Sequence, residues 1–217
     1  MNTLALWFCA AAFAGSAPTP LVDAALAKPS ELIALEPATM KSLLEQGSLL
    51  LVKQNADLSL HHVTAGQLVD APLDAVWATI TDLAGYSSFV PQTEGLKVLS
   101  RSDDNHLLVE QTLKLKIWHL PSINIKNQLA HELQPPRRIR FKHVSGDLPG
   151  TWGGWDLVPI GQQTMVFYTL YSNLTEVGWG LGAIFAAEPD YMAGINATTA
   201  LTVARAIKQE AERRVKK

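Results

Sequence analysis

Hydrophobic residues in the stretch 71–91, APLDAVWATITDLAGYSSFVP, follow the period of a helix and then stop. Leu73, Val76, Trp77 and Ile80 recur at the spacing that places side chains on one helical face. Gly85 then interrupts the pattern, and aromatic residues follow it. The stretch therefore predicts a short amphipathic helix that ends near residue 83, with an aromatic loop and a second short helix after it.

The chain before this helix predicts one further helix and two strands. Residues 28–47 have a helical pattern, with Pro37 near the first turn and Gly47 at the end. From residue 48 to about residue 70 the sequence is strand-like, and a turn near residues 55–57 divides it.

Beyond Pro91, hydrophobic and polar positions alternate with period two, as they do in strands with one buried face. Turns of hairpin length separate the alternating segments. The pattern predicts an antiparallel meander of at least five strands, at residues 107–118, 122–133, 138–144, 151–159 and 164–172.

An alanine-rich segment from Pro189 to about Arg214 predicts one long C-terminal helix. The stripe that we expect to be buried consists of Asn196, Ala200, Val203, Ile207 and Ala211. A strongly curved sheet cannot cover its own concave side, so a long helix laid across that side would complete the core. The predicted fold class is α+β, with one domain at residues 48–215 and residues 28–47 as an N-terminal helical extension.

Polar residues on otherwise apolar strand faces favour a cavity between sheet and helix over a dense core. They are Gln111, Asn127 and His143. The many Ala and Thr side chains of the long helix fit either a close approach to the sheet or open space beside it.

The first 27 residues differ from the rest of the chain. An apolar run from Leu4 to Ala14 is too short to span a bilayer, which needs about 20 residues, but it suits the core of a signal peptide. The only cysteine, Cys9, lies inside this run. We therefore expect a signal peptide at residues 1–27 and export to the periplasm or the exterior. The alternative is a soluble protein whose N-terminal segment associates with a membrane.

Composition narrows the choice of partner. The hydrophobic fraction of 47%, the charged fraction of 18% and the formal charge of −2 describe an ordinary globular protein. Because basic residues are not in excess, there is no electrostatic argument for a nucleic acid partner.

The stretch 71–99 resembles the N-terminal signature of the START-like (SRPBCC) helix-grip superfamily. It is nearest the branch of polyketide cyclase/dehydrase and coenzyme Q-binding proteins. The signature has an Ala-Pro helix start, a Val-Trp pair, an Asp that closes the helix, and an aromatic residue and a Pro before the second strand. In this sequence these features are Ala71-Pro72, Val76-Trp77, Asp82, Tyr86, Phe89 and Pro91.

A second part of the chain, residues 146–171, resembles the Gly-x-Trp strand of this superfamily and the strand that follows it. The resemblance covers about residues 58–214. It implies a helix-grip fold, in which a curved antiparallel sheet of about seven strands wraps around a long C-terminal helix and two short helices follow the first strand. Members bind lipids, quinones and hormones, and some are enzymes, so the resemblance is specific for fold and leaves function open.

The histidines suggest no metal site, and we expect neither a metal nor another cofactor. His61 and His62 are adjacent, so on a regular strand their rings would point to opposite faces and would not share a metal. His131-Glu132 does not continue into an HExxH motif, because Gln134 and Pro135 follow.

We expect the protein to bind a hydrophobic small molecule between the sheet and the long helix, such as a lipid, an isoprenoid quinone or a polyketide-like aromatic. Ordinary ligand pockets have about 300–1,000 Å³, so this hypothesis requires a cavity of at least about 300 Å³. Trp152 and Trp155 are three residues apart and should lie on opposite faces of their strand. The side chains predicted to line the cavity are Tyr86, Phe89, Trp118, Phe141, His143, Trp155 and Tyr168.

Two alternatives belong to other functional classes. One is a cyclase or dehydratase in which His143, the weak catalytic candidate, or a carboxylate in the pocket is the general acid-base group. The other is an interaction module whose 86–91 segment docks on a partner protein or makes transient contact with a membrane. Exposed side chains of Tyr86 and Phe89 would favour this second alternative, and buried ones would count against it.

Overall fold

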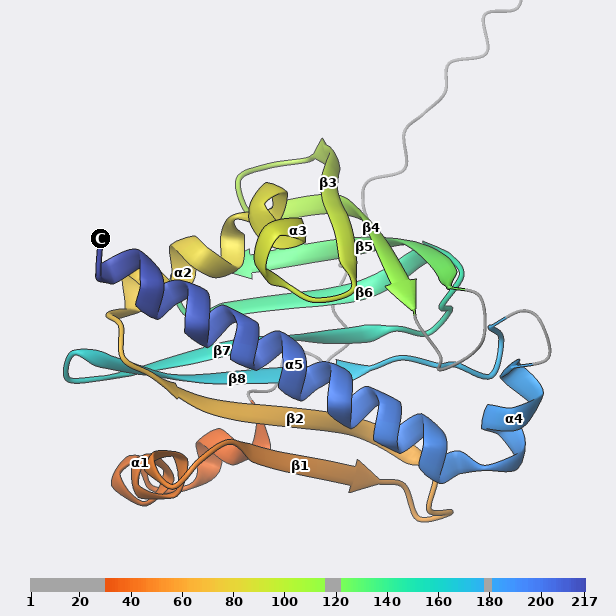
Figure 1. Ribbon diagram of the computed structural model, residues 1–217, viewed down its shortest axis with the longest axis horizontal. Coiled ribbons are helices and arrows are strands. Elements are labelled where there is room, and N and C mark those ends of the chain that lie inside the picture. Colours follow the sequence, from red (N-terminus) through yellow and green to blue (C-terminus); the bar gives the residue numbers. More distant parts are fainter. Residues whose placement is uncertain (1–29, 116–121, 178–180) are drawn as a thin grey trace, which may run out of the picture.

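Eight antiparallel strands form one curved, open sheet, and the long helix α5 lies across its concave side (Figure 1). The computed structural model describes residues 30–115, 122–177 and 181–217. The strands are β1 (Leu49–Gln54), β2 (Leu60–Val69), β3 (Thr93–Arg101), β4 (His106–Leu115), β5 (Ile123–Gln134), β6 (Arg138–Gly146), β7 (Trp152–Ile160) and β8 (Gln163–Tyr171). The helices are η1 (Glu31–Ala34), α1 (Pro37–Glu45), α2 (Leu73–Thr81), η2 (Leu83–Gly85), α3 (Tyr86–Phe89), α4 (Leu181–Ala187) and α5 (Pro189–Val215), where η denotes a 3-10 helix.

The strands follow one another as a meander from β3 to β8, and β2 then pairs with β8. The spatial order is β1-β2-β8-β7-β6-β5-β4-β3, so β1 and β3 are the edges. The predicted α+β helix-grip fold is confirmed, with eight strands in place of about seven. The seven strands β2 to β8 lie within the region of the family resemblance, and β1 precedes it.

Helix α5 packs closely on the sheet because its inward side chains are small. Ala200, Ala204 and Ala211 are fully buried together with Ile207. Of the predicted stripe, only Val203 is less than fully buried, and it still packs against the main core. Close approach is therefore the role of the alanines over much of the helix.

The N-terminal extension covers the opposite, convex face of the sheet. Met40 and Leu44 of α1 form a second hydrophobic cluster with Leu68, Met165 and Phe167 of β2 and β8. Residues 165 and 167 alternate with the inward-facing residues of β8, so this cluster lies on the other side of the sheet from α5. The single helix predicted for 28–47 is divided into η1 and α1.

The corner between α2 and α3 follows the sequence pattern closely. Asp82 ends α2, and its carboxylate accepts a hydrogen bond from the Gly85 N–H at 3.2 Å. A Cβ atom at residue 85 would lie 2.5 Å from the same carboxylate, so a larger residue there would have to displace the Asp82 side chain. The second short helix predicted after this turn is α3, and η2 leads directly into it, so Tyr86 and Phe89 lie in a helix and no loop separates the two helices.

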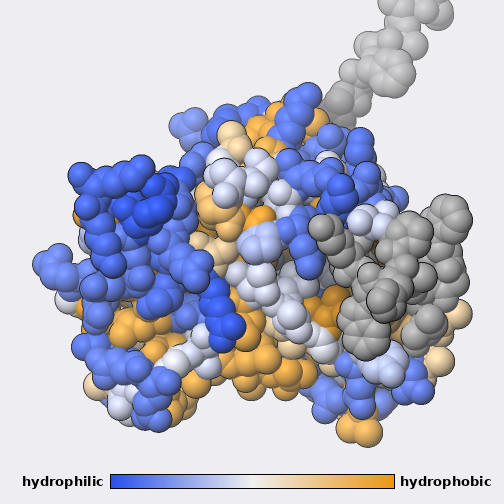
Figure 2. All heavy atoms as spheres, in the orientation of Figure 1, coloured by the Kyte–Doolittle hydropathy of each residue, from blue (hydrophilic) through white to orange (hydrophobic). Residues whose placement is uncertain are grey.

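The surface around α5 is mixed in polarity (Figure 2). The charged C-terminal end of α5 forms a hydrophilic area, and hydrophobic residues gather along the lower part of this face, where β1 and β2 lie in Figure 1. Leu50 and Val52 of β1 are among the exposed hydrophobic residues. Within the described residues, we find no helix with both the length and the apolar character needed to cross a membrane.

Candidate ligand-binding site

A cavity of about 130 Å³ lies between the concave face of the sheet and α5. Strands β3 to β8 form one wall, α5 forms the opposite wall, and the α2–α3 corner closes one end. The lining is mainly aliphatic and aromatic, and the described residues that line it include no Asp, Glu, Lys or Arg. The cavity therefore suits an apolar guest without formal charge.

Three aromatic side chains build the sheet wall of the cavity. Trp155 and Tyr168 are cross-strand partners, and their ring centroids are 4.3 Å apart. The Phe141 ring lies 6.2 Å from that of Tyr168. A Cβ atom at Gly153 would approach the Phe141 ring to 2.7 Å, so this glycine leaves the space that the ring occupies. Burial raises the pKa of the Tyr168 hydroxyl and keeps it protonated.

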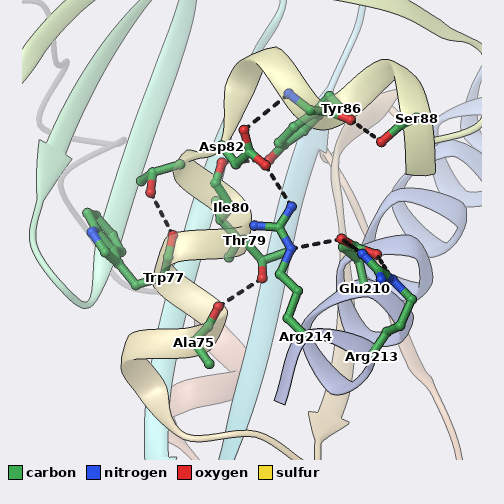
Figure 3. A network of polar contacts seen from close by, with 12 residues as sticks. Ala75, Trp77, Thr79, Ile80, Asp82, Tyr86, Ser88, Glu210, Arg213 and Arg214 are labelled. Carbon is green, nitrogen blue, oxygen red and sulfur yellow. Dashed lines mark hydrogen bonds and ion pairs between the residues drawn. The ribbon is translucent and has the colours of Figure 1, made fainter. Parts of the chain in front are cut away.

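Tyr86 closes the end of the cavity next to α2. Its hydroxyl donates to the carbonyl oxygen of Ile80 at 2.9 Å, and its ring is buried (Figure 3). Phe89 packs on Tyr86 with a centroid distance of 5.3 Å and faces Arg214 on its other side, 5.7 Å from the ring centroid. Burial raises the pKa of Tyr86, so this hydroxyl serves as a hydrogen-bond donor.

An ion-pair network attaches the same corner to the C-terminal end of α5 (Figure 3). Arg214 donates to Asp82 at 2.6 Å and to Glu210 at 2.8 Å, and Arg213 donates to Glu210 at 2.6 Å. The hydrogen bonds from the two arginines lower the pKa of Glu210 to about 2. The network fixes α5 relative to the corner that Tyr86 occupies.

Two polar atoms on β5 are buried at the cavity without a hydrogen-bond partner among the described residues. They are Nδ2 of Asn127 and Nε2 of His131. The other amide atom of Asn127, Oδ1, accepts from the Leu148 N–H at 2.9 Å, which fixes the orientation of the amide. The His131 ring stacks on Phe141, with centroids 5.5 Å apart. Burial lowers the pKa of His131 to about 4, so the ring is neutral at pH 7.

Asn196 of α5 also lines the cavity, and both polar atoms of its side chain form hydrogen bonds within the protein. Its Oδ1 accepts from the Ser172 N–H at 2.7 Å, and its Nδ2 donates to the carbonyl oxygens of Ser172 and Met192, each at 3.0 Å. Asn196 thus anchors α5 to the end of β8, and among the described residues the buried side-chain atoms without a hydrogen bond are those of Asn127 and His131 on β5.

The structure brings four of the predicted site residues together at the cavity: Tyr86, Phe141, Trp155 and Tyr168. Phe89 packs behind Tyr86 and is not among the lining residues. Trp118 lies outside the described residues. Trp155 faces the cavity and Trp152 faces the opposite side of the sheet, as the spacing of three predicts.

His143 does not line the cavity, so the expectation that it faces inward needs correction. It lies in a groove on the other side of the sheet, where its Nε2 is 3.4 Å from the carbonyl oxygen of Gly146. The pairing of β5 with β6 shifts register beside His143 and skips Val144. Such an irregularity re-aims side chains, so the alternation that holds for Ile139 and Phe141 ends there.

The prediction that His61 and His62 point to opposite faces of the sheet is wrong, because both line the same outer groove, which has a volume of about 670 Å³. Both rings lie in it, and their Nδ1 atoms are 2.7 Å apart. The pairing of β1 with β2 shifts register opposite Lys53, and a bulge of this kind places adjacent side chains on one side of the sheet. Both rings also contact Trp152.

His131 is a buried polar cavity residue that was not predicted from the sequence. A signal for it was present, because Ile125, Asn127 and Leu129 alternate along one face of β5 and the same alternation continues to His131. Its pairing with the inward-facing Phe141 places it on the cavity side.

The cavity is smaller than the 300 Å³ that the ligand-binding hypothesis requires. An apolar cavity of about 150 Å³ holds one benzene-sized ring, so the present volume corresponds to a guest of that size. A second pocket, of about 410 Å³, opens at the surface beside α2. The two spaces share a wall formed by Ile80, Leu83, His131 and Ile139.

Comparisons with known structures identify the same fold. A STAR-related lipid transfer protein from Xanthomonas axonopodis superposes with a TM-score of 0.58 at 14% identity, covering 76% of this chain and 94% of that one. The protein TTHA0849 from Thermus thermophilus gives 0.57 at 19% identity, with 70% and 98% covered. The Zhui aromatase/cyclase from Streptomyces sp. R1128 gives 0.54 at 19% identity, with 71% and 95% covered.

No curated protein sequence matches the chain significantly. The profile of a sequence family does match, over residues 69–187, which is more than half of the chain and includes α2, the meander and α4. The chain therefore belongs to the polyketide cyclase/dehydrase and lipid transport family.

Proposed function

We propose that the protein binds a hydrophobic small molecule in the cavity between the sheet and α5. The observation that carries the proposal is the lining of this cavity, which is mainly aliphatic and aromatic and includes no formally charged residue among those described. Its volume is below about 300 Å³, so the proposal concerns a ring-sized group or a ligand that enters with movement of the walls. Membership of a family described by polyketide cyclisation and lipid transport supports the same class of ligand. Lipids, isoprenoid quinones and polyketide-like aromatics remain the proposed candidates.

The cavity volume limits what can enter without movement. In this arrangement there is room for one ring-sized group. A longer ligand requires the shared wall of Ile80, Leu83, His131 and Ile139 to separate, which would join the cavity to the surface pocket beside α2. Nε2 of His131 has no hydrogen bond to a described residue that would oppose this movement.

A cavity-filling variant tests the proposal. Val203 lines the cavity from α5, whereas Leu201 is partly buried on the same helix and does not line it. We expect isopropylbenzene to bind the wild-type chain and Leu201→Phe with similar affinity, as measured by ligand-observed NMR. Val203→Phe should weaken binding at least tenfold, because the new ring occupies the guest's space. Equal binding to all three proteins, or none to the wild type, would contradict the proposal.

The catalytic alternative loses the residue named for it, because His143 does not line the cavity. Because His143 lies in the outer groove, His143→Ala should leave isopropylbenzene binding unchanged. The docking alternative is disfavoured, since Tyr86 is buried and Phe89 is partly buried against Arg214.

A further inference from the structure

The polar atoms of the cavity indicate what kind of hydrophobic molecule it accepts. An apolar enclosure normally has no buried donor or acceptor without a partner, because each such group loses its hydrogen bonds to water without replacement. Here Asn127 is 1% exposed and His131 is 8% exposed, and each has one nitrogen without a partner among the described residues. Both side chains line the cavity.

The chemical role of Asn127 is fixed by its surroundings. Only an oxygen can accept the Leu148 N–H, so Oδ1 is the atom held there and Nδ2 is the free one. An amide nitrogen is a donor and never an acceptor. Its missing partner is therefore an acceptor, such as a carbonyl, hydroxyl or ether oxygen.

The charge of the ligand follows from the rest of the lining. No described lining residue is Lys or Arg, so nothing there would pair with a carboxylate or phosphate, and burying an unpaired anion is very unfavourable. The cross-strand neighbour of Asn127 on β4, Gln111, also lines the cavity and is uncharged. The imidazole of His131 adds no positive charge, because desolvation keeps it neutral at pH 7.

We infer that the ligand is an uncharged hydrophobic molecule with a hydrogen-bond-accepting oxygen, and that the Asn127 amide recognises this oxygen. The inference rests on the proposed function and narrows it. It favours ketones, quinones, alcohols and neutral lipids, and it disfavours ionised fatty acids and anionic lipids. Asn127 is then the residue that determines specificity, and His131 offers a second polar position four residues along the same strand face.

Three probes of matched shape test this inference on the full-length chain. Acetophenone carries a carbonyl oxygen, isopropylbenzene replaces it with a methyl group, and benzoate carries a charge. We expect the ratio of acetophenone to isopropylbenzene affinity to fall about tenfold in Asn127→Leu, and benzoate to bind the wild type more weakly than acetophenone. Comparing ratios between proteins removes the difference in hydrophobicity of the two probes.

The outcomes separate the two proposals. If none of the probes binds the wild type, the proposed function fails. If isopropylbenzene binds but the affinity ratio is the same in Asn127→Leu, the cavity binds ligands and the inference about Asn127 is wrong. Should Asn127→Leu fail to fold, the side-chain amide signal of Asn127 in the wild type gives the answer. Both aromatic rings will shift this signal, but only the acetophenone carbonyl accepts a hydrogen bond, so the amide proton should move further downfield with acetophenone than with isopropylbenzene. The absence of this downfield difference would overturn the inference.

Discussion

Arg214, near the end of α5, donates a hydrogen bond of 2.6 Å to Asp82, the residue that ends α2. These residues are 132 positions apart in the sequence, and their contact joins the helix that covers the cavity to the corner that closes it. Asp82 also accepts from the Gly85 N–H, so one carboxylate both shapes the turn and binds the long helix.

The Asp82–Arg214 pair should stabilise the protein modestly. Both side chains are about one-third exposed, and pairs of this kind contribute about 0.2–1 kcal/mol. In a double-mutant cycle with Asp82→Asn and Arg214→Gln, we expect a coupling free energy in this range from urea unfolding. Asp82→Asn retains an oxygen for the Gly85 N–H, so the cycle isolates the ion pair. A coupling of zero would mean that the contact does not fix α5 to the corner.

The Tyr86 hydroxyl should contribute about 1 kcal/mol to the free energy of unfolding, because its hydrogen bond to Ile80 is buried. Tyr86→Phe removes this bond and leaves the carbonyl oxygen without it. The matched control is Tyr191→Phe, since Tyr191 is 60% exposed and should show almost no change. Equal effects in the two variants would show that the hydroxyl does not hold the corner.

Asp156 should be among the residues most sensitive to substitution. Its carboxylate accepts from Arg138 and Arg140, and the Arg140–Asp156 pair is almost fully buried. Asp156→Asn removes the carboxylate charge from an ion pair that is almost fully buried, and breaking a buried pair in this way typically costs about 3–5 kcal/mol. Glu45→Gln breaks only an exposed pair with Lys41 and should cost less than about 0.5 kcal/mol. Similar urea midpoints for the two variants would show that the buried Asp156 carboxylate does not stabilise the fold more than an exposed ion pair does.

The neutral state of His131 predicts a loss of stability in mild acid. Burial lowers its pKa from 6.5 to about 4, so between these values the unfolded chain binds a proton that the folded chain does not. Stability should therefore fall as the pH falls through this window, by on the order of 3 kcal/mol from this residue. His131→Phe should lose less stability than the wild type over the same range. Parallel pH profiles of the unfolding free energy would contradict the burial of a neutral ring.

The periodic parts of the sequence predicted most elements of the fold, and the family resemblance added the helix-grip arrangement. Alternation identified five strands of the meander, and helical spacing identified α2 and the buried stripe of α5. The spacing of Trp152 and Trp155 correctly predicted that they lie on opposite faces of the sheet, because β7 runs without a shift of register through its pairing with β8.

Site residues were harder to predict wherever a strand departs from regular pairing. Alternation assigned His143 to the inner face, but the skipped Val144 sends it to the outer groove. A similar shift beside Lys53 places His61 and His62 together. Bulges depend on how two strands pair, and a single sequence does not contain that information. His131, in contrast, continues an unbroken alternation and was within reach of the same reasoning.

The most direct test of the central claim is mass spectrometry of the intact protein under native conditions, after purification without detergent. We expect a co-purifying uncharged apolar molecule bound to the wild-type chain, released by organic solvent and absent or strongly depleted in Val203→Phe. A wild-type protein that is empty, and that also fails to bind acetophenone or isopropylbenzene, would show that the cavity is not a ligand-binding site.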